Sequence, residues 1–237
     1  DAGLTLVPYA ERCLMMATEC VRVGKGEGGR ASMDIVLGTR HELGLSWILP
    51  QLDELTRDQP FLQFHLYFGS GSDLLLRVRT MEIDCCVTST RLTDPKLDVL
   101  QLHREDYVFV GAKSLLAGEP LTRPEHAANH TLLDVDPNLS LFRYWRESPS
   151  GGDRLKFARV VRLGTIEAIR RRALAGAGVA VLPEYLVRGD VKAGKLRVIL
   201  PSVVPQHDYF RLVFRADDPR RSIYERMAQR MKQNALA

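Results

Sequence analysis

Residues 175–183 have the sequence Ala-Gly-Ala-Gly-Val-Ala-Val-Leu-Pro, which is the strongest indication of the fold class in the chain. The segment before it, residues 165–175, has the pattern of a helix. Val179–Leu182 is a short apolar run of the kind that forms a buried strand. A helix that leads directly into a buried strand is typical of an α/β protein.

The same alternation of short apolar runs and helical segments extends over most of the chain. Strands are predicted at 35–37, 64–68, 83–87, 107–111, 131–135, 158–163, 196–200 and 210–214, and helices at 45–55, 72–78, 139–147 and 220–233. The β-α-β order of the first half predicts right-handed crossovers and a largely parallel sheet. A second unit is predicted to begin near Lys113, where the composition shifts toward Gly, Pro and His.

A separate helix is predicted over residues 4–23, because this segment has no internal glycine and its proline lies near the start. Small and apolar residues recur there with the alternating 3 and 4 spacing of a coiled coil: Val7, Ala10, Leu14, Ala17 and Val21. A second row, Leu6, Cys13 and Cys20, widens this stripe. We expect a dimerisation helix; the alternative is an amphipathic helix docked on its own domain. The glycine-rich residues 24–30 predict a hinge.

The composition excludes several classes of protein. The 33 Lys and Arg against 29 Asp and Glu give a net charge of +4, which is mild for a nucleic-acid-binding domain. The 45% hydrophobic and 26% charged residues are typical of a globular chain and not of a disordered or fibrous one. No apolar run approaches the ~20 residues that cross a bilayer. Residues 1–4 contain neither an initiator Met nor the layout of a signal peptide, so we expect a soluble fragment of a longer protein.

The four cysteines, Cys13, Cys20, Cys85 and Cys86, have neither CxxC spacing nor a histidine cluster around them, so they do not predict a zinc site. The favoured interpretation is that they are small hydrophobic residues of a protein in a reducing compartment. A redox-sensing pair is the alternative.

Three predicted turns carry hydroxyl or charged side chains directly after a strand: Thr39–His41, Gly69–Ser72 and Gly164–Thr165. Ligands of α/β sheets bind at the carboxyl ends of the strands, and the N–H groups at the start of the following helix favour anions. Together the turns predict a site for a small anion. For each turn taken alone, simple capping of the following helix is the alternative.

Common catalytic motifs are missing from the sequence. It contains no G-x-S-x-G, no Walker sequence, no HExxH and no GxGxxG after the first strand, and its histidines lack metal-ligand spacing. The arginines at 170–172 predict a solvated surface, because no aromatic residues are interleaved with them to stack on bases. We therefore expect no enzyme, no metal site and no cofactor.

Taken as a whole, the chain resembles the LysR-type transcriptional regulators, without their N-terminal winged helix-turn-helix. The resemblance covers the family's linker helix, its opening strand, its Leu-Pro helix, its second strand and helix, its third strand with a leading Asp, and its glycine-rich helix end with a buried strand. The matching segments are Leu4–Val23, Ile35–Gly38, Ile48–Leu52, Phe61–Gly69, Leu74–Val87 and Ala175–Pro183.

The resemblance implies an α/β fold like that of the type 2 periplasmic binding proteins, with two Rossmann-like subdomains and a cleft, preceded by a linker helix. Residues 1–23 would be the linker and dimerisation helix, and 24–30 the hinge. Subdomain I would comprise residues 31–112 and 208–237. Subdomain II would comprise residues 113–207.

The resemblance further implies that a small effector binds in the cleft. The effector-binding residues expected from the family pattern are Thr39, Arg40, His41, Ser70, Thr88, Ser89, Asp134, Val135, Thr165 and Ile166. Arg40 would suit an anionic metabolite. The protein would be a cytoplasmic homodimer or homotetramer that binds DNA through the missing N-terminal module, with no membrane partner.

Two other functions of the same fold class remain as alternatives. A solute-binding protein that serves transport would be a monomer with a signal peptide, whereas this chain has a heptad helix and free cysteines. An enzyme would need a convergent acid and base, and the strongest candidates, His41 and Glu42, are adjacent in sequence and point apart. In the favoured hypothesis the effector stabilises one conformation, which is passed to the DNA-binding modules.

Overall fold

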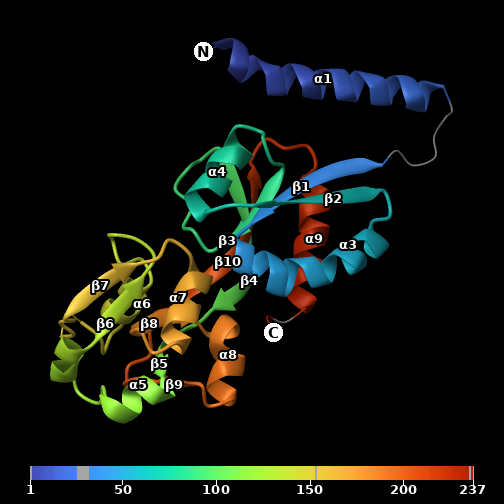
Figure 1. The fold of residues 1–237 in the computed structure, drawn as a ribbon. Helices are drawn as coiled ribbons and strands as arrows, with labels where there is room; N and C mark the ends of the chain where they lie inside the picture. Colours follow the sequence, from blue (N-terminus) through green and yellow to red (C-terminus); the bar gives the residue numbers. More distant parts are fainter. Residues whose placement is uncertain (1, 26–31, 153, 235, 237) are drawn as a thin grey trace. The chain divides into compact units, whose positions relative to one another are not determined.

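The computed structural model describes the chain except for residues 1, 26–31, 153, 235 and 237 (Figure 1). The chain divides into two compact units. The first unit consists of residues 1–103 and 209–237, and the second unit of residues 104–208. The second unit is therefore one continuous stretch, while the first is assembled from two stretches of the chain.

Helix α1 (Ala2–Gly24) forms where the heptad pattern predicts it. Every side chain of α1 whose exposure is described is exposed, including the large apolar Leu6 and Leu14. The segment predicted to be a hinge begins at Gly24, where α1 ends, and residues 26–30 of it lie outside the described residues. No helix in the described part of the chain combines the length and apolar character that crossing a bilayer requires.

The sheet of the first unit has five strands within the described residues, in the order β2-β1-β3-β10-β4. The strands are β1 (Met33–Thr39), β2 (Leu62–Phe68), β3 (Cys85–Thr88), β4 (Leu97–Glu105) and β10 (Asp208–Arg215). Strand β1 is parallel to β2 and β3, but β10 is antiparallel to β3. The sheet is thus mixed and not largely parallel as predicted, because a strand from the end of the chain enters it in the opposite direction.

Residues 41–58 form one helical segment whose hydrogen-bonding pattern changes along its length. It contains α2 (His41–Leu43), the π-helix η1 (Gly44–Ile48), the 3-10 helix η2 (Leu49–Gln51) and α3 (Leu52–Asp58). Pro50 lies at the start of η2. Because proline has no N–H to donate, a local change in hydrogen bonding is expected there. The helix predicted at 45–55 is confirmed, but it is not a uniform α-helix.

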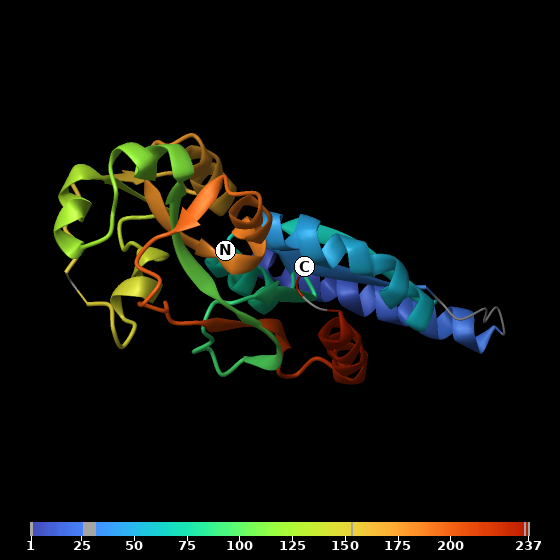
Figure 2. The ribbon, with the colours of Figure 1, turned by 90° about the horizontal axis from the view of Figure 1, so that it is seen from below.

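Helices α4 (Gly71–Arg79) and α9 (Arg221–Gln233) complete the first unit. The sequence predicts that Ser72 begins the first of these, but Ser70 caps it instead by accepting the N–H of Asp73 at 3.4 Å. Helix α9 packs beside β10 (Figure 2). The ring of Tyr224 in α9 stacks on that of Phe214 in β10, with centroids 4.7 Å apart.

The sheet of the second unit has five strands among the described residues, in the order β7-β6-β8-β5-β9. They are β5 (Tyr107–Ala112), β6 (Thr131–Asp134), β7 (Arg159–Arg162), β8 (Val179–Pro183) and β9 (Leu196–Val198). Strand β6 is parallel to β7 and β8, whereas β5 is antiparallel to β8 and β9. The resemblance implies a subdomain I that includes residues 107–111, but the strand partners of β5 all lie in the second unit.

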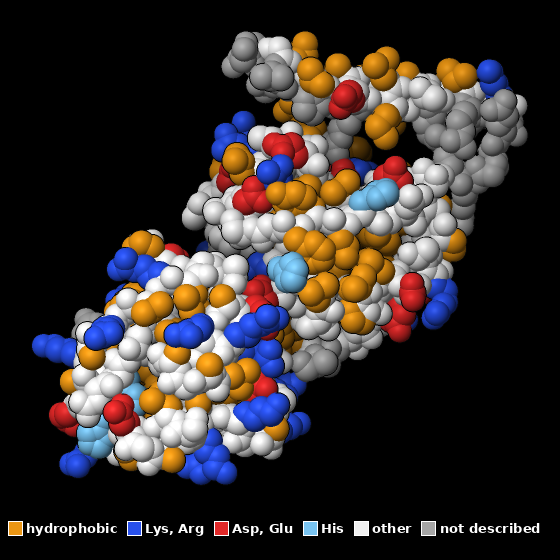
Figure 3. Space-filling model, viewed as in Figure 1, with side chains coloured by type: hydrophobic (Ala, Val, Ile, Leu, Met, Phe, Trp, Pro, Cys, Tyr) orange, Lys and Arg blue, Asp and Glu red, His pale blue; other side chains and the backbone are white. Residues whose placement is uncertain are grey.

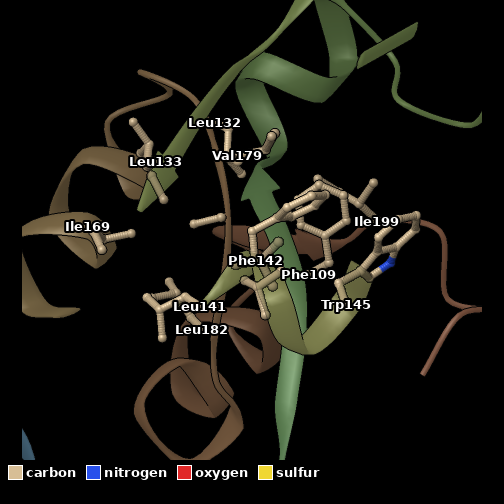
Figure 4. Packing of buried hydrophobic residues seen from close by; sticks show 14 of the residues in the cluster. Phe109, Leu132, Leu133, Leu141, Phe142, Trp145, Ile169, Val179, Leu182 and Ile199 are labelled. Atoms are coloured by element: carbon tan, nitrogen blue, oxygen red, sulfur yellow. The ribbon is translucent and has the colours of Figure 1, made fainter. Parts of the chain in front are cut away.

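The core of the second unit is built around aromatic residues from β5 and α6 (Figure 4). Phe142 and Trp145 stack with centroids 5.6 Å apart, and Phe109 lies at an angle to both rings. The helices around this core are α5 (Lys113–Gly118), η3 (Pro124–Asn129), α6 (Phe142–Arg146), α7 (Ile166–Leu174) and α8 (Glu184–Lys192).

The stretch 175–183 connects α7 to β8 through two glycines with different roles. Gly176 has a φ of +75°, a left-handed conformation that favours glycine at a helix end. Gly178 lies so close to β6 that a Cβ there would be 2.4 Å from the carbonyl oxygen of Thr131. The strand that follows is fully buried from Val179 to Leu182, as predicted.

Candidate functional site

The carboxyl ends of three neighbouring strands meet at one edge of the first sheet. Thr39, the last residue of β1, is in register with Phe68 at the end of β2 and with Val87 in β3. The N–H of Gly69 donates to the carbonyl oxygen of Thr39 at 3.0 Å, which holds the first two turns together. The predicted turns after β1 and β2 therefore lie side by side.

Hydroxyl side chains line this edge of the first unit. We call Thr39, Ser70, Ser72, Thr88, Ser89 and Thr90 the hydroxyl edge. The Thr88 hydroxyl donates to Thr90 Oγ1 at 3.0 Å and accepts the N–H of Thr90 at 3.1 Å. Gly71 lies directly against this pair, since a Cβ there would be 2.1 Å from Thr90 Oγ1. The first residue of α4 therefore has to be small, and its backbone approaches the hydroxyls closely.

Thr39 carries the most informative polar group of the hydroxyl edge. The residue is fully buried, and its Oγ1 has no hydrogen-bond partner among the described residues. Its methyl group faces Gly44, where a Cβ would be only 2.6 Å away. A buried hydroxyl without a partner costs about 1–3 kcal/mol of stability, so a ligand that pairs with it would recover that energy.

The N-terminus of α4 adds to the positive potential at this edge. The Ser70 hydroxyl caps the helix, and the Ser72 hydroxyl lies 3.5 Å from it. The nearby carboxylate of Asp73 accepts hydrogen bonds from Arg77 at 2.8 Å and from the Tyr67 hydroxyl at 3.1 Å. Its charge is thus balanced within α4, and the helix N-terminus still favours an anion.

Two arginines flank the hydroxyl edge. The guanidinium of Arg40, directly after Thr39, lies over the ring of Phe210 at 5.4 Å from its centroid. Arg211 in β10 is in register with Thr88 and donates to the carbonyl oxygen of Ser89 at 3.0 Å. Arg211 is not among the residues predicted from the sequence, because only the antiparallel pairing of β10 with β3 brings it to this edge. The one available signal is a charged residue inside an apolar strand.

His41 occupies the exposed start of α2. Its ring contacts the ring of Phe68, with centroids 5.3 Å apart. The first unit thus brings six of the predicted effector-binding residues to one edge of its sheet: Thr39, Arg40, His41, Ser70, Thr88 and Ser89.

The second unit contains the remaining expected residues, with Asp134 and Val135 at the end of β6. Asp134 is buried, and its carboxylate accepts the N–H groups of Val135, Leu141 and Phe142 at 2.7, 3.2 and 2.8 Å. Burial raises the pKa of Asp134, and these three hydrogen bonds oppose the rise without cancelling it. The side chain therefore holds the start of α6, and its carboxylate is occupied inside the unit.

Thr165 and Ile166 follow Gly164, which has a left-handed φ of +73°. The N–H of Gly164 donates to the carbonyl oxygen of Val135 at 3.1 Å, so the turn after β7 lies beside the end of β6. Thr165 is exposed and caps α7 by accepting the N–H of Ala168 at 3.2 Å. Ile166 belongs to the buried core of the unit. Within the described residues no group of three or more His, Cys, Asp or Glu is placed to hold a metal ion.

Comparison with known proteins assigns the fold to a family. Residues 28–236 match the family described as the LysR substrate binding domain. The chain belongs to this family. It is the effector-binding regulatory domain of a LysR-type transcriptional regulator, and the predicted periplasmic-binding-protein-like α/β fold is confirmed. LysR regulatory domains are not enzymes, which agrees with the prediction from the sequence.

The similar proteins are distant in sequence. A glycine cleavage system transcriptional activator homolog from Haemophilus influenzae is 23% identical over 176 residues, which are 73% of this chain and 56% of that protein. The chain thus spans little more than half the length of this curated relative.

Among solved structures, the CrgA regulatory domain of the LysR-type regulator from Neisseria meningitidis is 18% identical with a TM-score of 0.69, and the match covers 85% of this chain and 98% of that one. A variant of the OxyR2 regulatory domain from Vibrio vulnificus is 14% identical with a TM-score of 0.73, covering 89% and 98%. These likenesses show the fold.

Proposed function

We propose that this LysR regulatory domain binds a small anionic metabolite at the hydroxyl edge of its first unit. The observation that carries the proposal is the buried hydroxyl of Thr39, which has no partner among the described residues and lies next to the turn that begins α4. The proposed contacts in this unit are Thr39, Arg40, His41, Ser70, Thr88 and Ser89, and Arg211 is added to them.

The chemistry of this edge supports a carboxylate ligand. Hydroxyl groups and the N–H groups of a helix N-terminus donate hydrogen bonds to carboxylate oxygens. Arg40 and Arg211 supply positive charge on either side, and guanidinium groups match the planar geometry of a carboxylate. The carboxylate of Asp73 is already balanced by Arg77, so it does not oppose an anion.

The second unit contributes its own residues to the proposal. Thr165 and the backbone around Val135 lie beside each other, because Gly164 donates to the Val135 carbonyl. Asp134 and Ile166 would support this turn from inside the unit, since both are buried. Within this proposal the effector favours one conformation of the regulator by binding it more tightly than the other.

The proposal for the full protein extends beyond this chain. The intact regulator would bind DNA through an N-terminal module, act in the cytoplasm, and form a homodimer or homotetramer. The exposed stripe of Val7, Ala10, Leu14, Ala17 and Val21 on α1 supports dimerisation through this helix, because an apolar stripe of this length is normally covered.

Substitution of Thr39 tests the binding site. The variant Thr39→Val keeps the shape of the side chain and removes the hydroxyl, so the affinity for the effector is expected to fall about tenfold, the value of one hydrogen bond. The melting temperature without ligand should stay the same or rise, because a buried hydroxyl without a partner is removed. The measurement is a thermal-shift screen of small mono- and dicarboxylates, followed by calorimetric titration of the best ligand.

The matched control is Thr93→Val, an exposed threonine in the loop between β3 and β4. It should leave binding unchanged. If Thr39→Val binds the ligand as tightly as the wild-type chain, the hydroxyl edge is not the site.

A further inference from the structure

Helix α1 presents three rows of side chains, and each row repeats every seven residues. The small row runs along the middle, with the aliphatic row on one side and the thiol row on the other. Their members are Gly3, Ala10, Ala17 and Gly24 (small row), Val7, Leu14 and Val21 (aliphatic row), and Leu6, Cys13 and Cys20 (thiol row). All of them are exposed in this chain, and hydrophobic side chains follow α1 along its length (Figure 3).

The sizes of these side chains favour one direction of pairing between two α1 helices. In a parallel pair the small row meets the small row of the partner and the aliphatic row meets the aliphatic row, so that tight layers of glycine or alanine alternate with wide layers of leucine or valine. In an antiparallel pair the aliphatic row of one helix meets the small row of the other, as Leu14 meets Ala10 or Ala17. A large side chain then packs against a small one in every layer, and the two helix axes can approach to ~8 Å along their whole length.

We propose that oxidation joins two copies of this chain through a disulfide between the exposed cysteines of their α1 helices, which face each other when the helices pair antiparallel. The inference rests on the dimerisation through α1 proposed above. An antiparallel pair has its twofold axis perpendicular to the helices, so the thiol row of one chain faces the thiol row of the other. In a parallel pair the thiol row would face the opposite flank of the partner, where Thr18 and Lys25 stand.

The heptad repeat allows two cysteines to face each other in three registers of the pair. A shift of the two helices by seven residues replaces one member of the thiol row by the next, so the facing pair is Cys13 with Cys13, Cys13 with Cys20, or Cys20 with Cys20. With the helix axes ~8 Å apart, the facing Cα atoms are ~6 Å apart. Disulfides need a Cα separation of about 4.4–6.8 Å, so a bond can form without moving the backbone.

The chemistry requires an oxidant, for which a hydroperoxide is sufficient. The thiolate of one cysteine attacks the peroxide oxygen and becomes a sulfenic acid, and hydroxide leaves and is protonated to water when the oxidant is hydrogen peroxide. The thiol of the second chain then attacks the sulfenic sulfur, the S–S bond forms, and a second water leaves. Two thiols are oxidised and one peroxide is reduced. Cys85 and Cys86 do not compete, because both are buried and burial raises the pKa of each.

The experiment treats the 237-residue chain with hydrogen peroxide and measures the covalent dimer on a non-reducing gel. We expect a dimer band that disappears with reductant and is absent in the double variant Cys13→Ala/Cys20→Ala. Comparison of Cys13→Ala with Cys20→Ala identifies the register: both single variants lose the band if Cys13 faces Cys20, and only one loses it if a cysteine faces its own copy.

Two further variants test the direction and the face. In Cys20→Ala/Thr18→Cys, a parallel pair would place Cys13 opposite position 18 of the partner, so a disulfide between positions 13 and 18, identified by peptide mass spectrometry of the dimer band, would overturn the antiparallel arrangement. In Cys13→Ala/Cys20→Ala/Met16→Cys, the new thiol lies on the opposite side of the helix and should not crosslink.

Sedimentation under reducing conditions separates this inference from the proposed dimerisation. A dimer that requires α1 but does not crosslink would overturn the thiol pairing alone, whereas a monomer would overturn the dimerisation through α1 and this inference with it. The effector-binding proposal would stand in both cases, because it rests on the first sheet.

Discussion

Arg220 lies between two buried carboxylates of the first unit. Its Nη2 is 2.8 Å from Asp84 Oδ1 and 2.8 Å from Asp218 Oδ2. Asp84 also accepts the N–H of Val36 at 2.8 Å, and the Tyr224 hydroxyl donates to Asp218 at 3.0 Å. One cation thus connects β1, the start of β3 and the start of α9. Asp84, which directly precedes β3, therefore stabilises the fold by binding Arg220 from the start of α9.

Removal of this cation is expected to be costly. Arg220→Met keeps much of the packing volume but removes the cation shared by the two carboxylates and leaves Asp218 with the more distant Arg215 at 3.5 Å, which is expected to lower the free energy of unfolding by about 3 kcal/mol. The neighbouring variant Arg221→Met is the control, because Arg221 is exposed and its ion pairs with Asp98 and Glu225 are worth about 0–1 kcal/mol. Urea denaturation of both variants measures the difference, and equal losses would contradict the role of Arg220.

The same cluster predicts a pH dependence of stability. Burial by itself raises the pKa of Asp218, but the hydrogen bonds from Arg220 and Tyr224 outweigh burial, and the pKa is lowered overall. Because the pKa of Asp218 is lower in the folded chain than its unfolded value of about 3.9, the ionised carboxylate stabilises the folded state at pH values above about 3.9. This contribution is lost as the pH falls through the pKa of the folded state. Denaturation midpoints measured from neutral to acidic pH should therefore fall below pH ~4, and Asp218→Asn should flatten this decline.

Some polar residues of the candidate site can be predicted from the sequence, and others cannot. Thr39, Ser70 and Thr88 could be anticipated, because hydroxyls that follow parallel strands are brought to one edge. Asp134 also lies at the end of a strand, but its carboxylate accepts the N–H of Phe142 at the start of α6, a local contact that the strand pattern does not reveal. Arg211 depends on the register of an antiparallel pair far apart in sequence.

At the scale of elements, the connection from α7 to β8 depends on the absence of side chains. Gly178 brings the start of β8 against Thr131 of β6, and no other residue fits that space. Gly189 in α8 differs, because a Cβ at this position would meet nothing within 4 Å. The two glycines therefore have opposite consequences for stability.

Alanine substitutions at the two positions should shift stability in opposite directions. Gly178→Ala places a Cβ against the backbone oxygen of Thr131 and is expected to cost about 1–3 kcal/mol, because β6 and β8 have to separate. Gly189→Ala removes backbone freedom from the unfolded chain at an open helix position and should stabilise by about 0.5–1 kcal/mol. Thermal denaturation of the two variants measures both shifts, and a loss at Gly189 as large as that at Gly178 would refute the steric argument.

Among the elements, those defined by local pattern were predictable and those defined by distant pairing were not. The strand Val179–Leu182 and the helix α4 follow from their own residues. Strand β4 was missed, since its sequence includes Gln101, His103 and Arg104 and does not form an apolar run. Strand β5 was found but assigned to the wrong sheet, because nothing local distinguishes a strand that pairs with Val179–Pro183.

At the scale of the whole molecule, the two units differ in how the chain builds them. All strands and helices of the second unit come from residues 104–208. The first unit needs residues 209–237 as well, since β10 lies between β3 and β4 in its sheet. Without β10, strand β4 has no neighbour in that sheet.

This difference predicts which fragment folds. Residues 104–208 expressed alone should give a cooperative unfolding transition, because the segment contains its complete core and both edges of its sheet. Residues 32–103 alone should remain unfolded, since they lack β10 and α9. Circular dichroism and the fluorescence of Trp145 and Trp47, one in each unit, report the two outcomes. A cooperative transition in the shorter fragment would contradict the role assigned to β10.

The position of β10 also sets an order of events during synthesis on the ribosome. The first strands emerge early, but β4 waits for its neighbour until the second unit has been translated. The second unit can complete its core while the chain is still growing. The first sheet closes only when Asp208–Arg215 has left the exit tunnel, and Arg211 arrives with that strand. A nascent chain therefore cannot complete the proposed metabolite site until β10 has been synthesised and released.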